Sequence, residues 1–232
     1  MDRPDEPRMV RVAAMVADAT RARMLCFLLS GQYAAAGELA RAAGVVPATA
    51  SEHLSRLVDA DLVVCEPRGR HRYYRLADGE VAHALEALAL VAERGSHDRS
   101  WGSPARQRLR AARCCYGHIA GQLGVQLLDR LLGAGWLIRI DDRYRLTDAG
   151  AAGLTSWGLD GRDWQRRMAA APQARWIYPC LDWSERRDHM AGKFAAALLT
   201  HFVTQGWLRR RTGERALDVT ATGRAACSWL SV

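Results

Sequence analysis

Thiol and imidazole side chains gather at two places in the second half of this 232-residue chain. The six residues concerned are Cys114, Cys115 and His118 at the first place and Cys180, Asp182 and His189 at the second. His118 follows the two cysteines at a spacing of three or four residues, which would place these side chains on one face of a helix. Two cysteines and two histidines are a ligand set that suits zinc, copper(I) or a related ion. The pattern therefore predicts a transition-metal site or a thiol that responds to oxidation.

Other interpretations of these residues stay open at this point. Free cysteine is among the most buried residue types, so the thiols can simply fill core space. The histidines belong to a repeated His-x-Ala-Gly motif, which can serve helix packing with the imidazole bonded to a backbone carbonyl. A small organic effector in an apolar pocket is a further alternative. On the first of these interpretations the protein needs no cofactor.

The two places lie near the starts of two similar segments. Residues 118–137 and 189–208 align at an offset of 71 with eight identities in twenty, and a Thr-x-x-Gly motif follows in each. Each segment predicts a helix (119–134 or 190–205), a Gly-Trp-Leu strand, a turn, a second strand and a short helix. This order predicts a winged-helix-like unit built twice, over about 105–160 and 175–232, with a pocket at the seam. Cys180 follows Pro179 and is expected on a loop, away from the place that corresponds to Cys115.

The first half carries a different pattern of polar side chains. Residues 35–43 and 47–60 predict two helices, and Pro47 stands where a first helical turn accepts proline. On the longer helix Ala50, Leu54 and Leu57 share one face, which leaves short polar side chains on the other. Residues 62–66 and 71–76 predict a hairpin tipped with arginine. Two helices followed by a basic hairpin describe a winged helix-turn-helix, whose second helix enters the major groove of DNA.

Two further helices are predicted to form a dimer interface. Residues 79–94 are apolar nearly all round, so the helix that they form needs partners on more than one side. The small winged domain offers only one side. We therefore expect this helix and the opening helix, residues 9–17, to pack across a two-fold axis in a homodimer that reads two half-sites.

Three motifs in residues 9–94 resemble one known family. They are residues 18–25, the Ser-x-His-Leu-x-x-Leu pattern from Ser51 and the Gly-Arg-x-x-Tyr-Tyr pattern from Gly69. This part of the chain is similar to the ArsR/SmtB family of bacterial repressors. The resemblance implies a dimeric, effector-responsive transcription factor that binds a double-stranded DNA operator. It also implies DNA contacts by Thr49, Ser51, His53, Arg56, Arg68, Arg70, His71 and Arg72.

The known metal sites of that family are absent from this sequence. Metal-sensing members carry Cys-x-Cys on the first helix of the reading pair, or Asp-x-His with later partners on the helix after the wing. Here the first position reads Ala35-Ala36-Gly37-Glu38-Leu39, and the later helix offers only His83. Any sensing function is therefore expected in the second half of the chain.

The sequence as a whole predicts an α+β protein, mainly helical with small β-hairpins. We expect a winged helix-turn-helix domain over 1–97, a linker over 98–104 and the duplicated sensor domain over 105–232. Its composition, 49% hydrophobic and 25% charged, is globular. No signal-peptide layout or long apolar run is present, which predicts a cytoplasmic protein with reduced cysteines and no membrane partner.

No glycine-rich phosphate loop or catalytic triad spacing appears in the sequence, so an enzyme is not expected. The rival interpretations are a DNA-binding module fused to a thiol-dependent enzyme, with Cys115 and His118 as the candidate pair, or fused to a protein-interaction domain.

Overall fold

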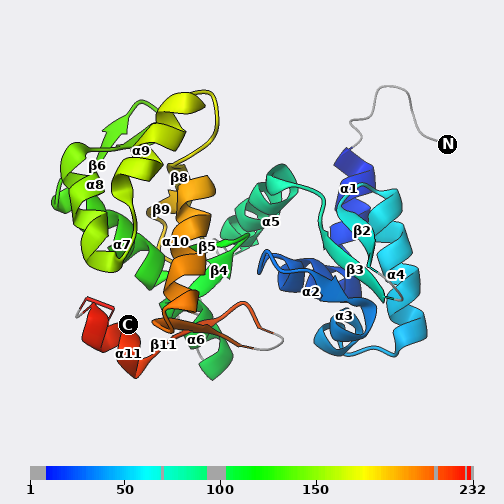
Figure 1. Cartoon of the computed structure of the whole chain (residues 1–232). Helices are drawn as coiled ribbons and strands as arrows, with labels where there is room; N and C mark the ends of the chain where they lie inside the picture. Colours follow the sequence, from blue (N-terminus) through cyan, green and yellow to red (C-terminus); the bar gives the residue numbers. More distant parts are fainter. Residues whose placement is uncertain (1–8, 69–70, 93–102, 212–213, 228, 231–232) are drawn as a thin grey trace. The chain divides into compact units, whose positions relative to one another are not determined.

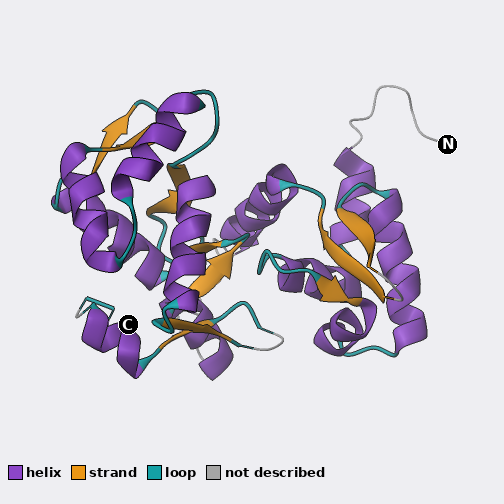
Figure 2. Cartoon of the chain, in the orientation of Figure 1, coloured by secondary structure: helices purple, strands orange, loops and turns teal. Residues whose placement is uncertain are grey.

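The computed structural model describes residues 9–68, 71–92, 103–211, 214–227 and 229–230. The chain divides into two compact units, residues 1–86 with 212–215 and residues 87–211 with 216–232. The division falls inside a helix, and most of the expected linker, 98–104, lies outside the described residues. The domain limits expected from the sequence therefore stay a prediction. In both units, helices alternate with short antiparallel strands (Figures 1 and 2).

The first unit has the element order of a winged helix-turn-helix. Its elements are α1 (Met9–Val16), α2 (Ala19–Leu28), β1 (Ala34–Ala35), α3 (Ala36–Ala43), α4 (Pro47–Asp59), β2 (Val63–Arg68), β3 (His71–Leu76) and the start of α5 (Gly79–Ala92). The expected helices and hairpin are present, and β1 adds a short third strand beside β3. Gly44 ends α3 at a φ of +72°, and Pro47 opens α4. The core between the helices holds Met24, Leu25, Leu39, Leu54 and Leu57.

The second unit repeats one order of elements. Its elements are α6 (Pro104–Ala111), β4 (Arg113–Cys115), β5 (His118–Ala120), α7 (Gln122–Gly133), β6 (Leu137–Ile140), β7 (Arg143–Leu146), α8 (Asp148–Leu154), α9 (Gly161–Ala170), β8 (Tyr178–Leu181), β9 (Asp188–Ala191), α10 (Lys193–Thr204), β10 (Leu208–Arg210), β11 (Leu217–Val219) and α11 (Ala221–Ala226). Hairpin, helix, hairpin and helix thus follow one another twice. In each case the helix after the first hairpin contacts the other half, because α7 contacts β9 and α10 contacts β5.

The two long helices of this unit begin later than the sequence pattern predicts. Residues 118–120 and 188–191 form strands instead, and each strand ends at a glycine with positive φ, +77° at Gly121 and +105° at Gly192. This conformation is open essentially only to glycine. The repeated His-x-Ala-Gly motif is therefore the end of a strand and not a helix-packing motif, which corrects that interpretation.

The repeated Thr-x-x-Gly motif caps the helix that follows it. Thr147 Oγ1 accepts a hydrogen bond from Gly150 N at 2.9 Å and donates to Gly135 O at 2.6 Å. Thr220 makes the same two bonds, at the same lengths, with Gly223 and Gly206. Each threonine thus satisfies a free backbone group at the start of α8 or α11 and joins that helix to the preceding hairpin.

Candidate functional site

Helix α4 has a buried apolar face and an exposed polar face. Ala50, Leu54 and Leu57 have no exposed surface. Ser51 and Arg56 are exposed on the other side, and Thr49 is half-buried. Arg56 Nη2 donates to Glu52 Oε1 at 2.6 Å, which is an exposed pair one helical turn apart. This face carries hydrogen-bonding groups and a guanidinium at the spacing of one helix turn, which suits contact with base edges.

His53 faces a neighbouring helix. Its Nδ1 atom lies 3.6 Å from Asp18 Oδ1 and 3.4 Å from Arg21 Nη1, and only 17% of its side chain is exposed. Asp18 is the N-cap of α2, where it accepts a hydrogen bond from Arg21 N. The structure therefore gives His53 partners within the protein. The DNA contact implied for His53 by the family resemblance stays a prediction.

The wing is the hairpin of β2 and β3, and it carries exposed basic side chains beyond an ion pair that joins its two strands. Arg68, His71 and Arg72 are exposed, whereas Arg70 lies outside the described residues. Arg75 Nε donates to Glu66 Oε1 at 3.0 Å, and this bond, with those from Tyr33 and Arg68, holds the pKa of the Glu66 carboxyl below its usual range.

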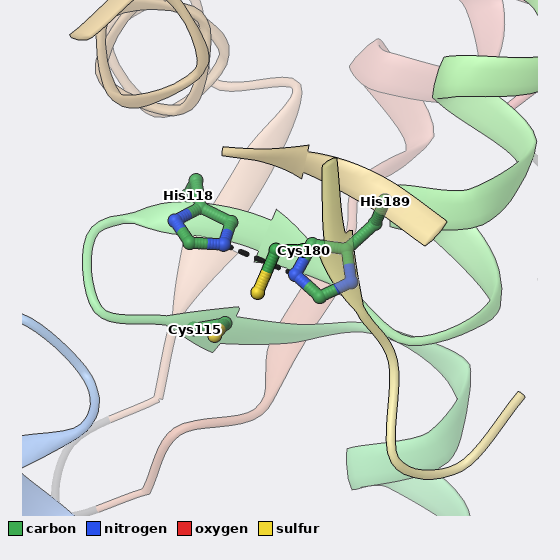
Figure 3. Close-up of side chains that lie close together, drawn as sticks. All are labelled: Cys115, His118, Cys180 and His189. Carbon is green, nitrogen blue, oxygen red and sulfur yellow. Dashed lines mark hydrogen bonds between the residues drawn. The ribbon is translucent and has the colours of Figure 1, made fainter. Parts of the chain in front are cut away.

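The thiols and imidazoles of the second unit come together from two hairpins. Cys115 lies opposite His118 in the pair β4–β5, and Cys180 lies opposite His189 in the pair β8–β9. Figure 3 shows the four side chains around one small space. Their donor atoms all lie within 4.8 Å of one another, and the two Nε2 atoms are 3.0 Å apart. All four side chains are buried, with residue exposures of 0 to 7%.

Two expectations about this cluster are wrong. Cys115 and His118 meet across a hairpin and not along a helix face. Cys180 lies in a strand, at the place that corresponds to Cys115. The sequence alignment hid this equivalence because two residues separate Cys115 from His118, whereas eight separate Cys180 from His189.

Cys114 and Asp182 lie beside the cluster without belonging to its four donors. Cys114 points to the opposite side of β4, into the apolar core, and burial raises the pKa of its thiol. Its Sγ accepts a hydrogen bond from Gly117 N at 3.3 Å. Asp182 is fully buried and lies 3.3 Å from His189 Nδ1, on the side of the ring away from His118.

Asp182 is the centre of a network that the sequence did not indicate. Its Oδ2 atom accepts from Arg113 Nη2 at 2.9 Å and from Gly121 N at 2.7 Å, and its Oδ1 atom accepts from Ser184 Oγ at 2.6 Å. Burial alone would raise the pKa of Asp182, but His189, Arg113 and Ser184 hold it well below its usual range. Burial would likewise lower the pKa of His189, yet Asp182 and Cys115 raise it to about 9.

Comparison with known proteins shows which class of protein this chain belongs to. A helix-turn-helix domain family model matches residues 16–66. An HTH-type transcriptional regulator of Bacillus subtilis, YdfF, which is described as uncharacterized, is 35% identical over 220 residues, or 95% of each chain. The chain belongs to the HTH-type transcriptional regulators. The match to YdfF includes the Cys/His hairpins, so the second unit is part of what this regulator shares with its relative.

Shorter relatives match about two fifths of this regulator. The HTH-type transcriptional regulator CmtR of Mycobacterium tuberculosis is 40% identical over 86 residues, 37% of this chain and 72% of CmtR. The solved structure of CmtR, described as a cadmium metal-sensor, has 35% identity over 41% of this chain and 98% of its own, with a TM-score of 0.32. A homodimeric winged helix-turn-helix domain from Mycobacterium bovis, described as a possible ArsR-family regulator, has 28% identity over 40% and 91%, with a TM-score of 0.35.

Within the described residues of this regulator, every helix is too short or too polar to cross a bilayer.

Proposed function

We propose that this regulator is an ArsR-type repressor that binds an operator as a homodimer and releases it or tightens on it in response to an effector. The observation that carries the proposal is the exposed polar face of α4 beside the basic wing, both held on a closed apolar core. Thr49, Ser51 and Arg56 would contact base edges. Arg68, Arg70, His71 and Arg72 would contact the phosphate backbone and set the position of the protein.

The proposed dimer rests on apolar side chains that the chain itself leaves uncovered. No residue of α1 is buried, and Met9 and Val10 are among its exposed side chains. Leu88 and Val91 of α5 are also exposed. A second copy of the same chain would cover these helices and place two α4 helices at successive turns of the major groove.

We propose that the second unit is the sensor, built from two winged-helix-like repeats. The recurring element order and the matching Thr147 and Thr220 caps support a duplication. The Cys/His cluster lies where the hairpins of the two halves meet, which makes it the candidate effector site. A thiol-dependent enzyme is disfavoured, because Cys115 and His118 are too deeply buried to meet a substrate.

Substitutions on α4 and the wing test DNA binding. We expect Arg56→Ala to weaken binding to the promoter of the regulator's own gene by about 1–3 kcal/mol. The variant should also lose part of its preference for the sequence at one base pair. Arg68→Ala should weaken binding to all duplexes alike and lower the salt slope by about 1. Both are measured by fluorescence anisotropy at several salt concentrations.

The matched control for these substitutions is Arg166→Ala, which removes the same charge from an exposed site in the second unit. Binding by this variant should match that of the unaltered regulator. Equal affinity of the unaltered regulator for its promoter and for a scrambled duplex would contradict the proposal.

Charges placed on α5 test the dimer. We expect the double variant Leu88→Glu, Val91→Glu to sediment as a monomer and to lose most of its operator affinity, because the dimer would have to bury four carboxylates, two from each copy, in its interface. The control is Ile138→Glu, an equally apolar side chain that is also exposed but lies in β6. A dimer that survives the double substitution would exclude this interface.

A further inference from the structure

The geometry of the Cys/His cluster points to one specific occupant. We propose that Cys115, His118, Cys180 and His189 are the four ligands of a single divalent ion of the zinc class, held in tetrahedral geometry. The cluster itself carries this assignment. Only the role of the ion as the effector of transcription rests on the proposed function.

The distances fit one ion and no larger group. Tetrahedral zinc with sulfur and nitrogen ligands keeps its donor atoms roughly 3.3 to 3.8 Å apart. The four donor atoms here all lie within 4.8 Å of one another, and the Nε2 atoms of His118 and His189, at 3.0 Å, are close to that spacing. A binuclear iron–sulfur cluster places its two ligand pairs on separate iron atoms and would need a wider site.

The charges favour a divalent ion. When Cys115 and Cys180 bind as thiolates, the ligand set carries two negative charges in a buried space. Behind it, the charges of Arg113 and Asp182 cancel, because these two side chains form a fully buried ion pair. A divalent ion makes the whole buried group neutral, whereas a monovalent ion such as copper(I) would leave one uncompensated negative charge there.

The surroundings of His189 are those of a metal ligand. Its Nε2 atom faces His118, and its Nδ1 atom faces Asp182 at 3.3 Å. A carboxylate behind the outer ring nitrogen fixes the tautomer and orientation of a metal-bound histidine. Asp182 is in turn fixed by Arg113 and by Gly121 N. Asp182 is therefore a positioning residue, with no contact to the ion.

The site is closed and joins two parts of the chain. Four protein ligands fill a tetrahedral sphere and leave no open position for a substrate, whereas a catalytic zinc site keeps one position open. Each hairpin supplies one cysteine and one histidine. The ion would thus tie β4–β5 to β8–β9, and each hairpin continues directly into a long helix, α7 or α10.

Metal analysis of the full chain tests the assignment. The protein is purified without oxygen, its metal content is measured, and the stripped protein is titrated with Zn²⁺ and with Co²⁺. We expect one ion per chain, and in the cobalt form the intense visible bands of tetrahedral Co²⁺ together with thiolate-to-cobalt charge transfer. Cys115→Ser and Cys180→Ser should each weaken zinc binding at least 100-fold.

Cys114→Ser is the matched control, because Cys114 is as buried as its neighbour and points to the other side of the strand. Cys227→Ser is a second control, buried in the same core away from the cluster. Both should retain the ion. Asp182→Asn should keep the tetrahedral cobalt spectrum and weaken binding about 10- to 100-fold, which a merely structural role would not produce in an otherwise folded variant.

The cobalt spectrum of the unaltered protein decides the question even if the serine variants fail to fold. An octahedral spectrum, no uptake of either ion, or a disulfide in the anaerobically purified protein would each overturn the site. Operator binding by loaded and stripped protein is compared separately. If the loaded and the stripped protein have the same midpoint of operator binding, only the effector role of the ion is overturned. If the metal-loaded protein shows no preference for the operator, the proposed function is overturned but the metal site is not.

Discussion

Replacing Arg113 with methionine should destabilise the second unit by about 3 to 5 kcal/mol, since it leaves the Asp182 carboxylate buried without its ion partner. Both side chains have no exposed surface, and their charged atoms lie 2.9 Å apart. Arg113 also lies 4.4 Å over the ring of Trp183, so its guanidinium contributes packing as well as charge. The free energy of unfolding is measured by urea titration, followed by tryptophan fluorescence.

Arg187→Met is the matched control for Arg113→Met. Arg187 Nη2 lies 2.8 Å from Asp129 Oδ1, as close as the buried pair, but both side chains are about half exposed. Its loss should cost less than about 1 kcal/mol. The double variant Arg113→Met, Asp182→Asn should recover part of the loss, because it removes the uncompensated charge. If Arg113→Met and Arg187→Met lower the free energy of unfolding by the same amount, burial does not determine how much the Arg113–Asp182 pair contributes to stability.

Gly121→Ala should also destabilise the protein strongly, by about 3 kcal/mol or more, because strain and a clash add up. Gly121 has φ +77° and ψ −165°, a conformation that an alanine adopts only at high cost. A Cβ atom there would collide with the carbonyl oxygen of Arg110, and Gly121 N donates a hydrogen bond to Asp182, so a shift of this backbone would disturb that bond as well. Thermal unfolding followed by circular dichroism measures the effect.

Gly133→Ala is the control, in the last turn of the helix that Gly121 starts. Nothing lies within 4 Å of a Cβ atom at Gly133. The same substitution should therefore leave stability unchanged or raise it by up to about 1 kcal/mol, because alanine loses less backbone entropy in a helix. If Gly121→Ala and Gly133→Ala unfold at the same temperature, the backbone conformation of Gly121 is not required to end β5.

The winged helix-turn-helix could be predicted from the sequence because each of its signals is local. Pro47, Gly44 and the apolar face of α4 lie within a few residues of the elements that they define, and the helix and strand limits came out within about three residues. The second unit shows the limit of such signals. The helical pattern of apolar residues in the sequence runs from His118 into α7 and from His189 into α10 without a break. In the structure the strand ends and the helix begins at Gly121 and at Gly192, where the backbone φ is positive.

The donors of the Cys/His cluster could be chosen by residue type, but their pairing could not. Cys180 corresponds to Cys115 only through a hairpin register, and an alignment without gaps at that point places them six residues apart. Arg113 gave no signal at all, because Tyr178 stands at the corresponding place in the second hairpin and the pattern therefore does not repeat. A long-range ion pair of this kind is visible only once the chain is folded.

Each hairpin supplies half of the Cys/His cluster, and this division has a consequence for how the second unit arose. On the proposed duplication, a single-copy ancestor could complete four ligands only by meeting another copy of itself, with the ion on the symmetry axis. Joining the two copies in one chain removed the requirement that both halves stay identical. The second hairpin could then lengthen by six residues and bring in Asp182, while the first kept its short turn.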